Sequence, residues 1–279
     1  MGPPQNYRLR RHKNEALRLR EIIKRRAAEL IIKNETEGDP EILAARASAC
    51  AFAEFVLVDD AGRRIELGPH QVAMLEHIED AHARGLHAGI LAPYGHGKTA
   101  CVIAYILRRI GMDPNIRVQI VSRVDSIAHD RLSAVRAYIE ESERYRRVYP
   151  GIDPDHLQWG RQAIRVRRDS KAIDPTVRGL GVLAASVGSR TDLQIFEDPI
   201  DVRAISPADR SAVSEQVFNT HLQRIESMAG LAVYSGTVYH QDDLAHQLLD
   251  AAGWSWFVCV VAPDQGSLQF VRFENGRAS

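Results

Sequence analysis

The stretch GILAPYGHGKTACVIAYILRRI, residues 89–110, decides the fold. It places a turn with two glycines and a lysine between a short apolar run over 87–93 and an almost entirely apolar segment over 99–111. The run has the length and composition of a buried strand, and the segment has the length of a buried helix. We therefore predict that strand, turn and helix follow one another directly.

The turn departs from the phosphate-binding pattern G-x-x-x-x-G-K-[ST] at one position. Gly97, Lys98 and Thr99 supply the end of the pattern, whereas Ala92 stands where its first glycine is expected. A phosphate site of this kind needs inward backbone N–H groups, a helix N-terminus behind them and one mobile cation. Alanine is compatible with that arrangement if its φ is negative. Taken alone, the loop leaves open both a nucleotide site and an ordinary strand-to-helix turn.

A nucleotide site would give the loop residues definite roles. Lys98 would reach the outer phosphates, and the Thr99 hydroxyl is placed to bind Mg²⁺. Gln71 lies on a helix predicted over 67–85, at a position where ATPases with this kind of loop often have a glutamine that contacts adenine. A solvated side chain is the alternative interpretation of Gln71. The residues predicted to bind nucleotide are Gln71, Tyr94, Gly95, His96, Gly97, Lys98, Thr99 and Ala100.

Two acids follow a second apolar strand, predicted over 192–199 in the stretch LQIFEDPI. Glu197 and Asp198 end that strand just before a proline. At such a position one carboxylate can hold a metal while its neighbour orients an attacking water. A plain strand cap is the alternative. Together, the acid pair and the loop favour a nucleotide site.

The rest of the chain continues to alternate between strand and helix. Periodicity and turn residues predict strands over 117–122, 163–169 and 230–237, and helices over 14–34, 42–55, 126–142 and 207–225. The alternation predicts an α/β fold with a mostly parallel sheet and helices on both faces. The strand over 117–122 can insert between the loop strand and the acidic strand, which favours the RecA-like, additional-strand class of P-loop NTPase. We expect an N-terminal helical, basic segment over 1–60, the P-loop domain over 61–262, and a tail or linker over 263–279.

Composition narrows the partners and the compartment. The 279 residues contain 36 Lys and Arg against 36 Asp and Glu, so no overall basic field favours nucleic acid. Three cysteines without metal-ligand spacing indicate a reducing compartment, and no apolar run is long enough for a membrane span. We therefore predict a cytoplasmic protein without membrane contact. Basic residues gather locally, in the first tenth of the chain and at Arg161, Arg165, Arg167 and Arg168.

Four stretches taken together resemble the ATPase half of the large terminase subunit, the DNA-packaging motor of tailed bacteriophages. LAPYGHGKT is similar to the phosphate loop of that family, usually PRGHGKS, and EDPID is similar to its carboxylate pair. The segment SPADRSAVSEQVFNTHLQRI resembles the helix that follows the pair, and SGTVYHQDDL resembles the coupling motif GTRWHxDDL. The likeness spans roughly residues 68–262.

The resemblance implies roles for single residues. Glu197 is the acid on the metal side and Asp198 the acid that orients water, although the family usually has two aspartates. Tyr94 replaces the arginine of the family's loop, so the charge of the transition state needs another cation. Arg190 is the first candidate for this arginine finger, acting within the chain or on a neighbouring copy, and Arg178 is the second. We therefore expect Lys98, Glu197, Asp198 and Arg190 to be catalytic, with Thr99 and Glu197 at the metal.

The resemblance also implies a coupling element and partners. Ser235, Gly236 and Thr237 would couple hydrolysis of ATP to motion, although Val238 and Tyr239 replace the usual Arg-Trp that follows. The implied partners are double-stranded DNA, the small terminase subunit and the portal protein, with a homo-oligomeric ring when assembled. The basic N-terminal segment and the arginines over 161–168 are candidates for phosphate contacts with DNA. Too few residues follow the coupling element for the nuclease domain of the family, so no nuclease activity is expected.

Two alternatives stay open. One is another RecA-like, DNA-dependent ATPase, although the chain has no room for a second RecA-like half. The other is a degenerate, non-hydrolysing nucleotide-binding assembly subunit, which Ala92, Tyr94 and the order of the acid pair favour.

Overall fold

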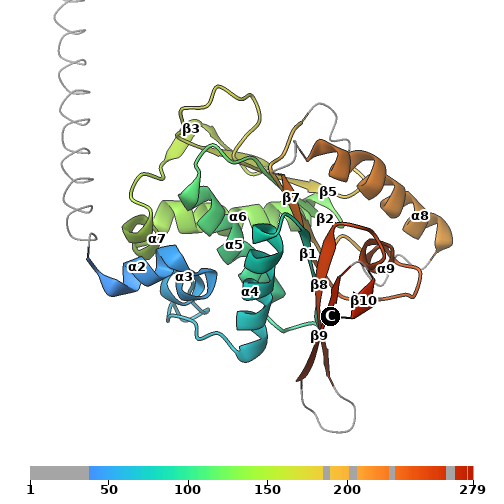
Figure 1. Ribbon diagram of the computed structural model, residues 1–279. Helices are drawn as coiled ribbons and strands as arrows, with labels where there is room; N and C mark the ends of the chain where they lie inside the picture. The colour runs from blue at the N-terminus through green and yellow to red at the C-terminus, as the bar shows by residue number, and fades with distance from the viewer. Residues whose placement is uncertain are drawn as a thin grey trace, which may run out of the picture.

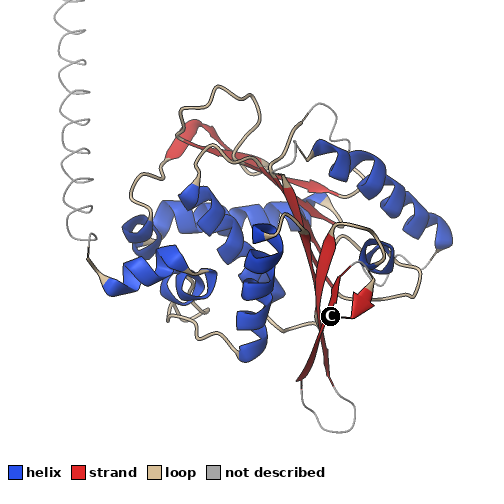
Figure 2. Ribbon diagram, in the orientation of Figure 1, coloured by secondary structure: helices blue, strands red, loops and turns tan. Residues whose placement is uncertain are grey.

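A single ten-stranded sheet with helices on both faces organises the described part of the chain (Figures 1 and 2). The computed structural model describes residues 38–184, 189–200, 206–225, 230–261, 268–274 and 276–278. The strands are β1 (His87–Leu91), β2 (Val118–Ser122), β3 (Pro154–Trp159), β4 (Ala163–Val166), β5 (Val177–Gly181), β6 (Leu193–Glu197), β7 (Leu231–Gly236), β8 (Trp254–Val261), β9 (Leu268–Glu274) and β10 (Arg277–Ala278). The helices are α2 (Pro40–Ala47), α3 (Ala49–Val56), α4 (Pro69–Ala83), α5 (Lys98–Met112), α6 (Asp125–Glu141), α7 (Glu143–Val148), α8 (Pro207–Gln216) and α9 (Leu244–Leu249).

The strand order is β10-β9-β8-β1-β7-β6-β2-β5-β4-β3. The six central strands, from β8 to β5, are parallel, and antiparallel strands extend the sheet at both edges. Every residue of β2, β6 and β7 is buried, because helices cover both faces of these strands. The predicted fold class, α/β with a mostly parallel sheet, is confirmed.

The lateral position of one strand differs from the prediction. The strand expected over 117–122 is β2, and it lies beyond β6 instead of between the loop strand β1 and the acidic strand β6. The inserted strand is β7, in which Ser235 pairs with Ile90 on one side and with Glu197 on the other. The additional-strand interpretation holds, but β7 fills that place, because sequence order does not dictate the order of parallel strands in a sheet.

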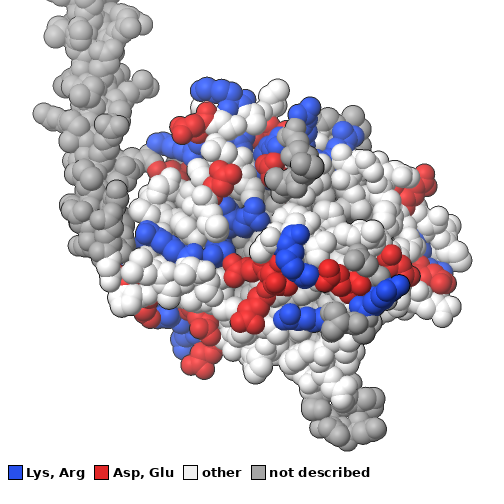
Figure 3. Space-filling view, viewed as in Figure 1, with Lys and Arg blue, Asp and Glu red and all other residues white. Residues whose placement is uncertain are grey.

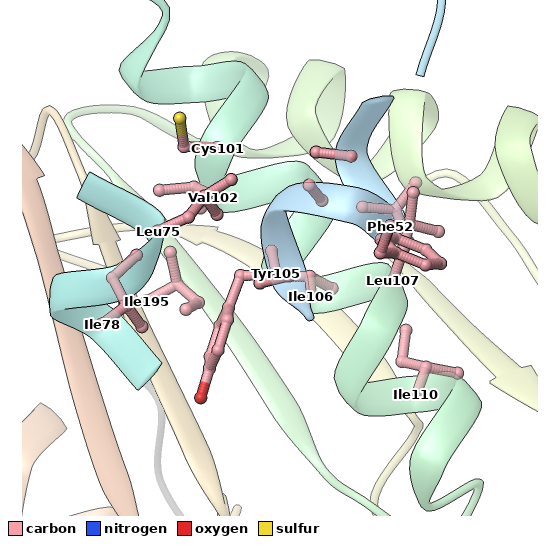
Figure 4. Close-up of a cluster of buried hydrophobic side chains, with 14 of the residues drawn as sticks. Phe52, Leu75, Ile78, Cys101, Val102, Tyr105, Ile106, Leu107, Ile110 and Ile195 are labelled. Carbon is pink, nitrogen blue, oxygen red and sulfur yellow. The ribbon is translucent and has the colours of Figure 1, made fainter. Parts of the chain in front are cut away.

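Two apolar cores lie on the two faces of the sheet. On one face, α3 to α7 pack their apolar sides against the sheet, and Figure 4 shows Phe52, Leu75, Leu107 and Ile195 among the buried side chains there. On the other face, α8 and α9 enclose a second cluster that contains Phe196, Tyr234, Leu248, Trp254 and Trp256. The adjacent β6 residues Ile195 and Phe196 thus pack in opposite cores, as expected for a strand that is buried on both faces.

Two short helices lie in the N-terminal segment expected from the sequence, and strands lie in the C-terminal one. The helix expected over 42–55 is two helices, because Ser48 ends α2 and caps α3, its hydroxyl accepting a hydrogen bond from the Ala51 N–H at 3.4 Å. Both helices pack into the same core as α5, and residues 268–274 form β9 in the sheet. The bounds expected for the segments over 1–60 and 263–279 stay a prediction, because both segments include residues outside the described ranges. The helix expected over 14–34 lies outside them.

No helix in the described ranges is both long and apolar enough to span a membrane.

Candidate nucleotide site

The C-terminal ends of three neighbouring strands meet at one edge of the sheet. β1 leads into the loop over 92–97, β6 ends in Glu197, and β7 ends in Gly236, with β7 between the other two. Ligands of open α/β sheets bind outside the carboxyl ends of the strands. This edge therefore holds the candidate site.

The loop over 92–97 turns through two glycines with left-handed backbone. Gly95 has φ +81° and Gly97 has φ +76°, a region that side chains with a Cβ rarely adopt. Gly97 also lies against Gln71, because a methyl group added to Gly97 would come within 2.1 Å of Gln71 Nε2. Gly97 is the N-cap of α5, so the first N–H groups of this 15-residue helix open toward the loop.

Lys98 is held within the loop and is nearly buried, with 6% of its surface exposed. Its Nζ donates to the carbonyl oxygens of Ala92 at 2.7 Å and Pro93 at 3.1 Å, and to the Thr237 hydroxyl at 3.2 Å. These three bonds use all the donors of an ammonium group. Burial lowers the pKa of Lys98, and the nearby carboxylates of Asp198 and Glu197 oppose that shift.

Glu197 is a buried carboxylate with a donor on each oxygen. The Thr99 hydroxyl donates to Oε1 at 2.5 Å, and Arg131 Nε on α6 donates to Oε2 at 3.0 Å. The Glu197 side chain is 2% exposed, and a buried charge requires such partners. The structure therefore brings together the hydroxyl and the carboxylate that were predicted to hold Mg²⁺.

Asp198 has a strained backbone and a perturbed acidity. Its φ is +43°, and it is the only non-glycine residue with positive φ among the described residues. Its N–H donates to the Ser235 carbonyl at 2.8 Å, which fixes the turn after β6 against β7. Burial, and then the charge of Glu197, raises the pKa of Asp198. Strained backbone and shifted acidity often accompany reactive groups.

Two of the predicted coupling residues, Gly236 and Thr237, contact the loop over 92–97. Ser235 and Gly236 end β7, and the Thr237 hydroxyl donates to the Ala92 carbonyl at 3.2 Å while accepting the bond from Lys98. Thr237 thus bridges the end of β7 and the loop.

The rest of the coupling motif is organised by Asp243, which is 1% exposed. Its carboxylate accepts from the N–H groups of Tyr239, His240 and His246, and it caps α9. The chain that follows Thr237 is therefore tied to the start of α9.

The other predicted nucleotide-binding residues lie around the loop. Gln71 Oε1 accepts from the Gly68 N–H at 2.8 Å, so this amide caps α4 as well as packing against the loop. Tyr94 is 95% exposed at the tip of the loop. The His96 ring contacts the ring of His70 with centroids 5.4 Å apart. Ala100 lies in the first turn of α5.

The two candidate arginine fingers lie toward the amino ends of the strands, on the side of the sheet opposite the candidate site. Arg190 precedes β6, and its N–H donates to Asp174 at 3.4 Å; Arg178 is in β5 and borders the same small pocket as Arg190. The length of β6, about 13 Å at 3.3 Å per residue, separates this edge from the acid pair. The structure does not bring either arginine to the loop of its own chain.

Sequence reasoning missed two residues of the site, Arg131 and His70. Arg131 lies in a helix whose exposed face carries several charges, so nothing in its spacing distinguishes it. His70 precedes Gln71 on α4, and only the contact with His96 connects it to the loop.

The fold is similar to that of a bacteriophage large terminase. The crystal structure of the HK97 bacteriophage large terminase superposes with a TM-score of 0.53 and 13% identity, over 74% of this chain and 40% of that one. The chain thus spans 40% of the length of that terminase. The resemblance seen in the sequence motifs is confirmed at the level of the fold.

A second solved structure, of S. cerevisiae Dbp5 in a complex that includes ADP, has a TM-score of 0.35 and 14% identity, over 65% of this chain and 49% of that one. That TM-score does not establish a shared fold. No protein-family model matches the chain, and no curated protein matches it significantly in sequence.

Proposed function

We propose that the chain is the ATP-hydrolysing motor of a DNA-packaging machine of the large-terminase type. The observation that supports this most is the meeting of four side chains at one edge of the sheet. Thr99 contacts Glu197 at 2.5 Å, and Lys98 contacts Thr237 at 3.2 Å. The loop, the acid pair and the coupling element are thereby joined in one network.

The residues present fit a nucleotide with Mg²⁺. Two left-handed glycines and the N-terminus of α5 suit the close approach of a phosphate, and Lys98 supplies a cation. The Thr99 hydroxyl and the Glu197 carboxylate are oxygen ligands, which Mg²⁺ prefers. Gln71, His96 and the exposed Tyr94 lie where they could contact the rest of the nucleotide.

Each residue of the site would then have its own role in the hydrolysis of ATP. A bound MgATP supplies the phosphoanhydride and the metal charge. Lys98 would exchange its carbonyl partners for phosphate oxygens, and Glu197 and Thr99 would hold the metal. Asp198 orients the attacking water, and its raised pKa brings it closer to the operating range of a general base.

The proposed coupling step follows from the Lys98 ammonium, which donates to the Thr237 hydroxyl and would also donate to a bound phosphate. An ammonium that turns toward a phosphate releases the Thr237 hydroxyl, which then keeps only its bond to Ala92. Because Asp243 ties the following segment to α9, a shift at Thr237 reaches that helix. We propose that Ser235, Gly236 and Thr237 transmit nucleotide state in this way.

Double-stranded DNA is the proposed substrate of the motor, with the small terminase subunit and the portal protein as partners in a ring. On the face in Figure 3, acidic and basic side chains are intermixed. Contact with DNA would therefore depend on local exposed groups such as Arg161 and Arg167. Because Arg190 lies at the edge opposite its own loop, we propose that it acts on the nucleotide of a neighbouring copy.

The test is Mg²⁺-dependent ATP hydrolysis by the purified chain, with and without long double-stranded DNA. We expect turnover that DNA stimulates and that Lys98→Ala abolishes. Arg63→Ala is a control, because Arg63 pairs only with the neighbouring turn residue Asp59 at the surface. Absence of hydrolysis at every Mg²⁺ concentration, with nucleotide still bound, would contradict the motor.

A non-hydrolysing assembly subunit is the second candidate, and one observation favours it. Both oxygens of Glu197 are already engaged, by Thr99 and Arg131, which opposes binding of a metal. Nucleotide binding without turnover, unchanged by DNA, is the result expected for that subunit.

A further inference from the structure

Arg131 contacts the acid pair from a helix that no motif includes. It lies on α6, which follows β2, and its Nε donates to Glu197 Oε2 at 3.0 Å. The Arg131 side chain is 32% exposed, whereas that of Glu197 is 2% exposed. The guanidinium therefore sits at the mouth of the site, in contact with a buried carboxylate on one side and accessible on the other.

Among the described residues, most of the hydrogen-bonding capacity of Arg131 is unused. A guanidinium has five N–H donors, and only Nε makes a hydrogen bond to any described residue. The two terminal nitrogens form the fork that binds phosphate or carboxylate oxygens in pairs. Contact through Nε holds this fork beside the acid pair, and its charge also acts on Asp198.

The other cations considered for this purpose lie elsewhere in the described part of the chain. Lys98 occupies the loop itself, and position 94 is a tyrosine. Arg178 and Arg190 lie at the far edge of the sheet. Arg131 is the arginine that its own chain brings to Glu197.

We infer that Arg131 recognises the terminal phosphate of a nucleoside triphosphate bound in the loop of its own chain, and so distinguishes a triphosphate from a diphosphate. This inference rests on the proposed function. Arg131 would hold Glu197 through Nε and present its terminal nitrogens to the phosphate oxygens. A diphosphate lacks the group they would reach.

The test compares binding of the non-hydrolysable analogue AMP-PNP and of ADP by calorimetry, in Mg²⁺ and in EDTA. For Arg131→Gln we expect AMP-PNP affinity to fall about tenfold or more, the size of a lost charge-assisted pair. ADP affinity should change little, and the preference should be lost in both media. The EDTA arm matters because Glu197 acts through the metal, whereas the fork contacts the phosphate directly.

Arg136→Gln is the matched control. Arg136 lies on the same helix and pairs with Glu140 at 3.5 Å on the surface, so its loss should change neither affinity. Arg131→Lys keeps the charge and loses the fork. The lysine variant should bind AMP-PNP more weakly than the wild-type protein does, and its affinity for ADP should be unchanged. The inference therefore remains testable if Arg131→Gln does not fold.

Three outcomes would overturn the inference: equal losses for both nucleotides, a loss that disappears in EDTA, or no loss. The first two would make Arg131 a positioning residue for Glu197 only. If the wild-type chain binds neither nucleotide, or binds as well with Lys98→Ala, the proposed function fails and the inference fails with it. Binding that requires Lys98 but ignores Arg131 overturns the inference alone.

Discussion

The Thr237 hydroxyl lies 3.2 Å from the Lys98 ammonium and joins the end of β7 to the phosphate loop. The same hydroxyl donates to the Ala92 carbonyl, which also accepts a hydrogen bond from Lys98. Thr237 therefore contacts both the donor and the acceptor of that bond. Because a phosphate would compete for the same ammonium, we expect occupancy of the loop to change the position of Thr237.

Thr237→Val should separate hydrolysis from its stimulation by DNA. Valine keeps the shape of the side chain but can neither accept from Lys98 nor donate to Ala92. We expect DNA-stimulated turnover to fall about tenfold, the size of one lost hydrogen bond, with basal turnover less affected. Steady-state ATPase assays with and without DNA measure both rates. Thr237→Ser keeps the hydroxyl and should retain stimulation; equal losses of both rates in the valine variant would count against a coupling role.

Asp198→Asn should remove the base and leave the fold intact. Asparagine tolerates the left-handed backbone at this position better than most residues, so the substitution changes charge with little added strain. We expect turnover to fall by roughly 10²–10⁴-fold with nucleotide affinity nearly unchanged. Single-turnover hydrolysis and equilibrium binding give the two numbers. A fall of less than a few fold would assign the base elsewhere.

The acid limb of the pH–rate profile should reflect the raised pKa of Asp198. The base works only when it is deprotonated, so turnover falls as the pH drops through the pKa of the folded protein. Because burial and Glu197 raise that pKa, activity should be lost at a higher pH than an ordinary aspartate would allow. Profiles of kcat/KM from pH 8 downward test this, and an acid limb at or below the usual aspartate range would contradict it.

Acid should destabilise the fold through His82. Its Nδ1 contacts the Tyr105 hydroxyl at 2.5 Å, and burial lowers its pKa from 6.5 to about 4. The unfolded chain therefore binds the proton first, so stability is complete above pH 6.5 and falls as the pH drops toward 4. The loss amounts to up to about 3 kcal/mol.

Urea unfolding at pH 7 and pH 5 measures this loss. His82→Gln should be less stable at pH 7 and should lose less stability on acidification than wild type. An unchanged pH dependence would show that other groups, such as the buried His77 and the half-buried His87, are responsible.

Gly89→Ala should destabilise the sheet at the strand that feeds the loop. A Cβ at Gly89 would lie 2.1 Å from the Trp256 ring of β8, which is fully buried. Because that ring is packed in the second core, we expect a loss of about 1–3 kcal/mol. Chemical denaturation checks this. Gly151→Ala is the control, since a Cβ there meets nothing within 4 Å; equal losses would rule out the contact with Trp256 as the cause.

The strand, loop and helix around Lys98 and the acid pair after β6 could be predicted from sequence because their signals are local. A buried parallel strand is a short apolar run, and the glycines of the loop are required by its backbone angles. The fold class followed from the alternation of such runs with helices. Except for Gln71, which lies on the preceding helix, the predicted nucleotide-binding residues were found through the loop pattern, and the structure places them all around the loop.

The features that sequence could not predict depend on relations between distant segments. Which parallel strand lies beside β1 is decided by how helices cover the sheet, so β2 and β7 could not be told apart. Arg131 has no local signal, because a charged residue on a helix is ordinary until its partner is known. Arg190 precedes the acidic strand in sequence, yet the length of that strand carries the two to opposite edges.

The place of β7 has a mechanical consequence. A strand paired on both sides cannot slide without breaking two ladders, so β1 and β6 hold β7 in register and any displacement must begin beyond Gly236. That exit leads toward α9, on the face that carries α8 and the smaller core. We therefore propose that the layer from α3 to α7 stays fixed and that the α8–α9 layer moves when the conformation of the loop changes.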